Sequence, residues 1–201
     1  GQAEEEARAA LEALHGLLPG YRNELGPTLG LWILDAAVVE QVMEGLAQAE
    51  ALLAQSPDFT TWQAVTAIVA YARDDQPVMI RELRRLAAGD FALIEDLTWT
   101  AVATTLSRPV LAVGDATMAA ALYAKLAPYS GTMTWNGLST HGPVDAGLAC
   151  LAAVAGDHDA FRRHRDLSRS LVDRLAAPHL WWPDLDRLTK QRDTDVAPQL
   201  R

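Results

Sequence analysis

The sequence predicts an all-α protein in which helical hairpins stack into a right-handed superhelix. Two observations lead to this fold class. Apolar residues recur at intervals of three and four along most of the chain, which is the pattern of helices that bury one face. Similar segments also return about every 40 residues, which is typical of helical-repeat proteins. We find no alternating apolar and polar stretch bounded by Asn-Gly or Asp-Gly, so the sequence gives no indication of a sheet.

The repeat is visible in matching segments and in matching turns. The segment 61–65, TWQAV, returns at 98–102 as TWTAV, with four of the five residues identical. Turn signals recur at Asp74-Asp75, Gly114-Asp115 and Gly156-Asp157, each between two apolar-periodic stretches. A glycine can end a helix in the left-handed conformation, and an aspartate can cap the next helix. We therefore expect each repeat to be two helices joined by a tight turn.

These signals divide the chain into hairpins within one domain, 1–201. Prolines near the expected boundaries and Pro77 near the start of a second helix agree with the division. The arrangement is typical of a tetratricopeptide-like α-α superhelix. The expected hairpins are 27–56, 59–89, 95–129 and 142–176, with an N-terminal helix at 3–18 and a C-terminal cap at 178–192.

Composition and charge narrow the possible functions. Half of the 201 residues are apolar, yet no apolar run is long enough to span a bilayer, so we expect no membrane insertion. Residues 1–100 hold 6 basic and 16 acidic residues within a net charge of −9, which disfavours direct contact with nucleic acid. Cys150 is the single cysteine, so the chain cannot form an internal disulfide or a cysteine-rich zinc site. A cytoplasmic location fits these features best.

Several stretches resemble a known family. They are 90–99 (DFALIEDLTW), 121–129 (ALYAKLAPY), 142–145 (GPVD) and 175–181 (LAAPHLW), together with the two Gly-Asp turns. They resemble the C-terminal tetratricopeptide-like repeat region of large bacterial ATP-dependent LuxR-type transcriptional regulators and of adenylate cyclase–ATPase fusion proteins. In such proteins the ATPase and DNA-binding activities belong to other domains. The resemblance implies a non-catalytic module without a cofactor, although the loop 131–138, GTMTWNGL, departs from the glycine-rich family pattern.

The expected function is therefore that of a scaffold or sensor module, which contacts a protein partner or the attached ATPase or output domains. Trp62 and Trp99 occupy equivalent repeat positions, which favours packing between hairpins, whereas Trp135 falls in an irregular loop beside polar residues. The alternative is a small-molecule effector bound in the concave groove. The candidate partner- or ligand-binding residues for either function are Trp99, Tyr123, Trp135, Asn136 and His141.

Other chemistry has weaker support in the sequence. Ser139 and His141 could suggest a hydrolase, but the Gly-x-Ser-x-Gly turn of such enzymes is missing, and a loop that caps the following helix is the preferred interpretation. His158 and His164 lie six residues apart and would point to opposite helix faces, so we expect no shared metal. Cys150 lies among apolar residues, which favours core packing with a raised thiol pKa. The sequence thus predicts no catalytic residue, metal site or cofactor. A cluster of arginines is interpreted as a solvated helix face: Arg162, Arg163, Arg165 and Arg169.

Overall fold

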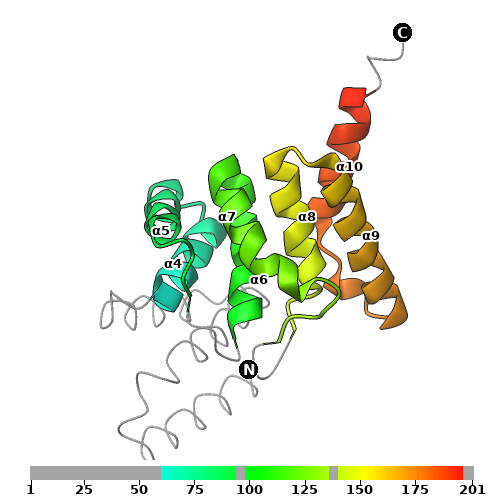
Figure 1. Ribbon diagram of the computed structural model, residues 1–201, viewed down its shortest axis with the longest axis horizontal. Coiled ribbons are helices and arrows are strands. Elements are labelled where there is room, and N and C mark those ends of the chain that lie inside the picture. Colours follow the sequence, from blue (N-terminus) through cyan, green and yellow to red (C-terminus); the bar gives the residue numbers. More distant parts are fainter. Residues whose placement is uncertain (1–59, 94–97, 136–139, 197–201) are drawn as a thin grey trace, which may run out of the picture.

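The computed structural model describes residues 60–93, 98–135 and 140–196 (Figure 1). These residues form seven α-helices and two short 3-10 helices, and no β-strand occurs among them. The predicted all-α fold is confirmed for this part of the chain. The predicted helix at 3–18 and the predicted hairpin at 27–56 lie outside the described residues.

Successive helices form hairpins that follow one another across the molecule (Figure 1). The helices lie within the predicted hairpins 59–89, 95–129 and 142–176. The first hairpin is α4 (Thr60–Ala72) with α5 (Gln76–Ala88), the second is α6 (Trp99–Val113) with α7 (Ala116–Leu126), and the third is α8 (Val144–Ala155) with α9 (His158–Arg174). The short helix η1 (Ala127–Tyr129) extends α7, and η2 (Pro178–Leu180) leads into α10 (Pro183–Val196).

The turns inside the hairpins have the predicted chemistry. Gly114 and Gly156 end α6 and α8 with φ angles of 73° and 75°, in the left-handed region that glycine adopts without strain. Asp115 then accepts hydrogen bonds from the amides of Thr117 and Met118, and Asp157 accepts one from Ala160. These bonds satisfy amides that would otherwise lack a partner at the helix start.

The hairpins pack mainly through their first helices. Helix α4 lies against α6, α6 lies against α8, and α7 also packs on α8. A close approach occurs at Gly147 of α8, where a Cβ atom would lie 3.0 Å from Thr104 Cγ2 and 3.1 Å from Ser107 Oγ of α6. A side chain at this position would therefore push the second and third hairpins apart.

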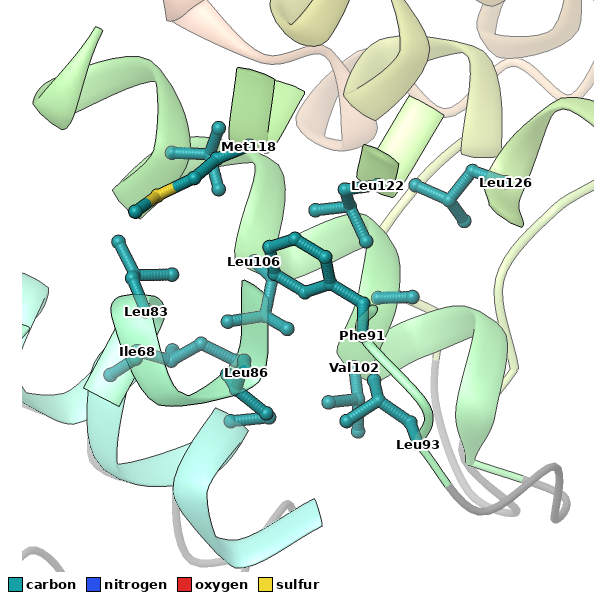
Figure 2. Close-up of a cluster of buried hydrophobic side chains, with 14 of the residues drawn as sticks. Ile68, Leu83, Leu86, Phe91, Leu93, Val102, Leu106, Met118, Leu122 and Leu126 are labelled. Carbon is teal, nitrogen blue, oxygen red and sulfur yellow. The ribbon is translucent and has the colours of Figure 1, made fainter. Parts of the chain in front are cut away.

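The first two hairpins share a cluster of large apolar side chains (Figure 2). Phe91 enters this cluster from the segment after α5 and is only 1% exposed. Asp90 and Phe91 both adopt positive φ angles, 54° and 49°, an unusual conformation for residues with a side chain. Burial of the Phe91 ring within this cluster offsets that backbone strain. Labelled members of the cluster include Ile68, Leu83, Leu86, Val102, Leu106, Met118, Leu122 and Leu126.

Two local features differ from simple sequence rules. The N-cap residue of α8 is Pro143, which makes no side-chain cap hydrogen bond, and the Val144 amide donates instead to the carbonyl of Thr132. The capping role expected for Ser139–His141 was therefore wrong as far as Thr140 and His141 are concerned, and Ser139 lies outside the described residues. Helix α6 continues through Pro109, which removes one backbone donor without ending the helix. In the ranges that the structure describes, no helix is long and apolar enough to cross a bilayer.

Candidate functional site

The predicted binding residues lie in different environments. Trp99 is only 6% exposed and packs against Tyr129, with 4.9 Å between the ring centroids. Trp135 is 47% exposed, in the loop between η1 and α8. Asn136 lies outside the described residues. The geometry of Trp99 is that of a core residue, whereas Trp135 presents its ring to solvent.

Tyr123 and His141 are half-buried and hydrogen-bonded. The Tyr123 hydroxyl lies 2.8 Å from His164 Nε2, and the His141 amide donates to Thr134 Oγ1. The His141 carbonyl accepts a hydrogen bond from Trp182 Nε1 at 2.9 Å. A binding role for the five predicted residues stays a prediction, as does a small-molecule pocket formed by them.

Hydrogen bonds join the residues on either side of the loop that carries Trp135. Thr134 is 1% exposed and accepts the His141 amide while its hydroxyl donates to the carbonyl of Gly142 at 3.0 Å. An isolated β-bridge joins Met133 and Pro143. These contacts hold the two ends of the loop together beneath Trp135.

A buried polar network anchors the start of this loop to the third hairpin. Asp145 on α8 is fully buried, and its Oδ1 lies 2.7 Å from Nδ1 of His164 on α9. The same carboxylate accepts hydrogen bonds from Ser130 Oγ at 2.8 Å and from the Gly131 amide at 2.6 Å. Tyr123 of α7 completes the network at the other ring nitrogen of His164. The Asp145–His164–Tyr123 network thus joins α7, α8, α9 and the loop.

Both ring nitrogens of His164 have a hydrogen-bond partner. Nδ1–H donates to Asp145, and Nε2 shares a hydrogen bond with the Tyr123 hydroxyl. Burial acts to raise the pKa of Asp145, but the hydrogen bonds from His164, Gly131 and Ser130 together hold that pKa below its ordinary value. Asp145 is therefore a charged group whose buried position is stabilised by three donors.

This arrangement has a hydroxyl, a base and an acid in series, and both the base and the acid are buried, at 3% and 0% exposed. Tyr123 Oη also lies 3.4 Å from Nη2 of Arg163. The network therefore positions the loop and α9. The sequence did not predict this network, because Asp145, Tyr123 and His164 lie far apart along the chain. The available signal was the helical spacing of His164 with apolar residues of α9, all of them buried: Ala160, Phe161 and Val172.

A second polar feature is a groove of about 330 Å³ between α9 and α10. The Arg169 guanidinium carbon lies 3.5 Å from the centroid of the Trp181 ring. Trp181 Nε1 donates to Asp186 Oδ2 at 3.0 Å. The groove is lined by Arg165, Asp166, Arg169, Trp181, Asp186, Thr189 and Lys190, and it includes none of the predicted binding residues.

The other candidates can be located in the structure. Cys150 is buried in α8, and burial raises the pKa of its thiol to about 12, as expected for a core residue. His158 is exposed at the first position of α9, while His164 is buried in the network. Among the described residues, no three His, Cys, Asp or Glu side chains gather as metal ligands would. Of the arginine cluster, Arg162, Arg163 and Arg169 are exposed and Arg165 is half-buried.

No protein family, no curated protein and no solved structure matches this chain. The fold and the two polar features described above are therefore what bears on its function.

Proposed function

We propose that the chain is a non-catalytic helical-repeat scaffold that contacts a protein partner or neighbouring domains of a larger regulator. The observation that carries this proposal is the regular packing of α4 on α6 and of α6 on α8. Hairpins that contact their sequence neighbours bury a continuous core and leave extended faces for binding. In this proposal they continue as a right-handed, tetratricopeptide-like superhelix.

The buried polar groups support a scaffold more than an enzyme. Asp145 and His164 are 0% and 3% exposed and their polar atoms are bonded to other parts of the chain. Catalytic groups need access to a substrate, and this pair has no exposed reactive atom. Exposed features of the described residues include the loop ring of Trp135 and the groove beside Trp181. Aromatic rings of this kind commonly anchor protein partners.

The resemblance of residues 90–99 and 121–129 to LuxR-type regulators supports a more specific setting. In that setting the chain belongs to a cytoplasmic bacterial signalling or transcriptional regulator. It would transmit the binding of a partner to an attached ATPase or output domain.

Site-specific photo-crosslinking in the native cell tests this function. A photoreactive amino acid replaces an exposed residue of each hairpin in turn: Arg84 on α5, Ala124 on α7, Trp135 in the loop and Arg162 on α9. We expect adducts with one reproducible protein or domain, confined to neighbouring positions. The control sample is denatured before irradiation and should give no adduct.

Two outcomes would contradict the scaffold function. A chain that gives no adduct at any position and remains monomeric in light scattering would not be a scaffold. Ester hydrolysis that disappears in Ser139→Ala would instead favour the hydrolase alternative.

A further inference from the structure

The groove between α9 and α10 contains an arginine that is held in place and still has donors to offer. Arg169 lies flat on Trp181 at 3.5 Å, close enough for a strong cation–π contact. Its nearest carboxylate oxygen, Asp186 Oδ1, lies 3.7 Å from Nη2, which is beyond hydrogen-bond distance. Within the described ranges its guanidinium donors therefore have no hydrogen-bonded acceptor. Stacking on Trp181 holds the plane of the Arg169 guanidinium and leaves its N–H edge available to a hydrogen-bond acceptor.

Asp186 forms only a long ion pair with Arg169, at 3.7 Å. Its Oδ2 accepts the indole proton of Trp181 at 3.0 Å, which keeps the carboxylate on the tryptophan. Arg165, on the same side of α9, is already paired with Asp166 at 2.8 Å and lies over the Phe161 ring. Arg169 is thus an oriented cation in the groove whose donors can bind a ligand.

The charged residues that line the groove indicate which kind of anion it can bind. Its lining holds three basic residues, Arg165, Arg169 and Lys190, and two acidic ones, Asp166 and Asp186. This balance matches a ligand with a single negative charge. A phosphate dianion would be repelled more strongly by the two carboxylates than a single carboxylate would be.

We propose that this groove binds the side-chain carboxylate of an acidic segment in a protein partner. Arg169 donates two parallel hydrogen bonds to the carboxylate, and the Trp181 ring packs against an apolar neighbour in the segment. The site extends the proposed scaffold function and rests on it, since it names the partner chemistry that one face of the array recognises.

The test uses the whole chain and two matched peptides, acetyl-Ala-Leu-Glu-Leu-Ala-amide and its Gln counterpart. Titrations are followed by the NMR signal of the Trp181 indole N–H. We expect a saturable shift with the Glu peptide and none with the Gln peptide. Arg169→Gln should weaken binding about tenfold or more, because it removes a charge-assisted bidentate contact.

Control variants separate this site from general electrostatics. Arg174→Gln removes an exposed arginine of the same helix, which is bonded to Ser170 and lies outside the groove, and should leave the Kd unchanged. Arg169→Lys keeps the charge but loses the planar donor pair, so it should bind more weakly than the native chain. Asp186→Asn should tighten binding roughly threefold, because it removes a nearby negative charge.

Three results would overturn the proposal. The first is equal binding of the Glu and Gln peptides. The second is an equal loss of affinity in Arg169→Gln and Arg174→Gln. The third is a larger shift of the Trp181 indole N–H signal with inorganic phosphate than with the Glu peptide. If the peptides fail while photo-crosslinking still finds a partner elsewhere on the array, the groove proposal falls and the scaffold function stands. If both fail, both proposals fall.

Discussion

The first two hairpins and the C-terminal part of the described chain are held together by different kinds of contact. Between α4 and α7 the contacts are made by large apolar side chains such as Leu83, Phe91, Leu106 and Leu122 (Figure 2). The buried carboxylate of this region, Glu82, pairs with arginines of its own helix at 2.7 Å and 3.3 Å and joins no two helices.

Around α8, α9 and α10 the apolar cluster combines small residues such as Ala146, Ala149 and Cys150 with the larger Phe161, Trp182 and Leu185. Polar contacts join the elements here. Asp145 binds His164 between α8 and α9, and Asp184 of α10 binds Arg108 of α6 at 2.8 Å. Burying charged groups is costly unless their partners are in place, so removing one partner of these contacts should be strongly destabilising.

The difference indicates how the two regions respond to their surroundings. Apolar burial changes little with pH, whereas a buried ionic network depends on the protonation of its members. The exposed Trp135 loop and the Arg169 groove both lie at the polar end. The surfaces proposed to bind a partner are therefore attached to the region that polar contacts hold in place.

The largest expected effect comes from removing the central carboxylate of the polar region. Asp145→Ala leaves His164, Ser130 and the Gly131 amide without their acceptor in a buried site. Loss of one partner from a buried pair costs about 3–5 kcal/mol, and we expect the free energy of unfolding in urea to fall by that amount. A decrease in the free energy of unfolding below about 1 kcal/mol would mean that apolar contacts also hold α8, α9 and α10 together.

The same carboxylate predicts an acid dependence. Despite burial, the hydrogen bonds from His164, Gly131 and Ser130 hold the Asp145 pKa below its ordinary value of about 3.9, so folding favours the ionised form. This stability is fully present above that ordinary pKa and is lost as the pH falls through the folded value. Urea unfolding from about pH 6 down to about pH 3 should show a steeper loss in the native chain than in Asp145→Asn. Parallel curves would contradict the prediction.

Leu106→Ala tests the apolar region. Leu106 is fully buried in the cluster of Figure 2, and a cavity there should lower the free energy of unfolding by about 3 kcal/mol. The loss should be the same at neutral and at mildly acidic pH. Leu167→Ala, at a position 39% exposed on α9, is the control and should change stability by less than about 0.5 kcal/mol. If the loss of stability in Leu106→Ala depended on pH, the two regions would not differ in their pH dependence as proposed.

The sequence predicted the features that depend on neighbouring residues. Helical periodicity and the turns at Gly114-Asp115 and Gly156-Asp157 are local, and both turns were confirmed. The pairing of Asp145 with His164 arises only when α8 packs on α9, so no local pattern marks it. Trp99 is among the candidate binding residues although its repeat position favours packing between hairpins, and it is only 6% exposed.

Phe91 illustrates the same limit within the core. Its burial depends on two successive positive φ angles after Gly89, a backbone path that residue preferences disfavour. The Arg169–Trp181 stack was missed for a related reason. The arginine cluster was interpreted as a solvated face, and the ring that covers one of its members comes from a separate segment.

Tyr123→Phe probes the edge of the polar network with a smaller change. It removes the hydroxyl that lies 2.8 Å from His164 Nε2 while keeping the ring in place. Loss of one hydrogen bond at a half-buried site should cost about 1.5 kcal/mol, measured by thermal or urea unfolding. Arg163→Gln removes only the longer contact of 3.4 Å to the same hydroxyl and should cost less. An equal cost in both variants would place the important contact at Arg163 instead.

The smallest effects are expected at the two helix caps, which are chemically alike but lie in different regions. Asp115→Ala in the second hairpin and Asp157→Ala in the third should each cost about 1 kcal/mol in urea unfolding, because each exposes helix amides that lose their acceptor. The Asn variants keep an acceptor oxygen and should retain most of that stability. Similar costs at both caps would mean that the two regions differ only in how helices contact one another. A clearly larger cost for Asp157→Ala would mean that the start of α9 is coupled to the His164 network six residues further along the same helix.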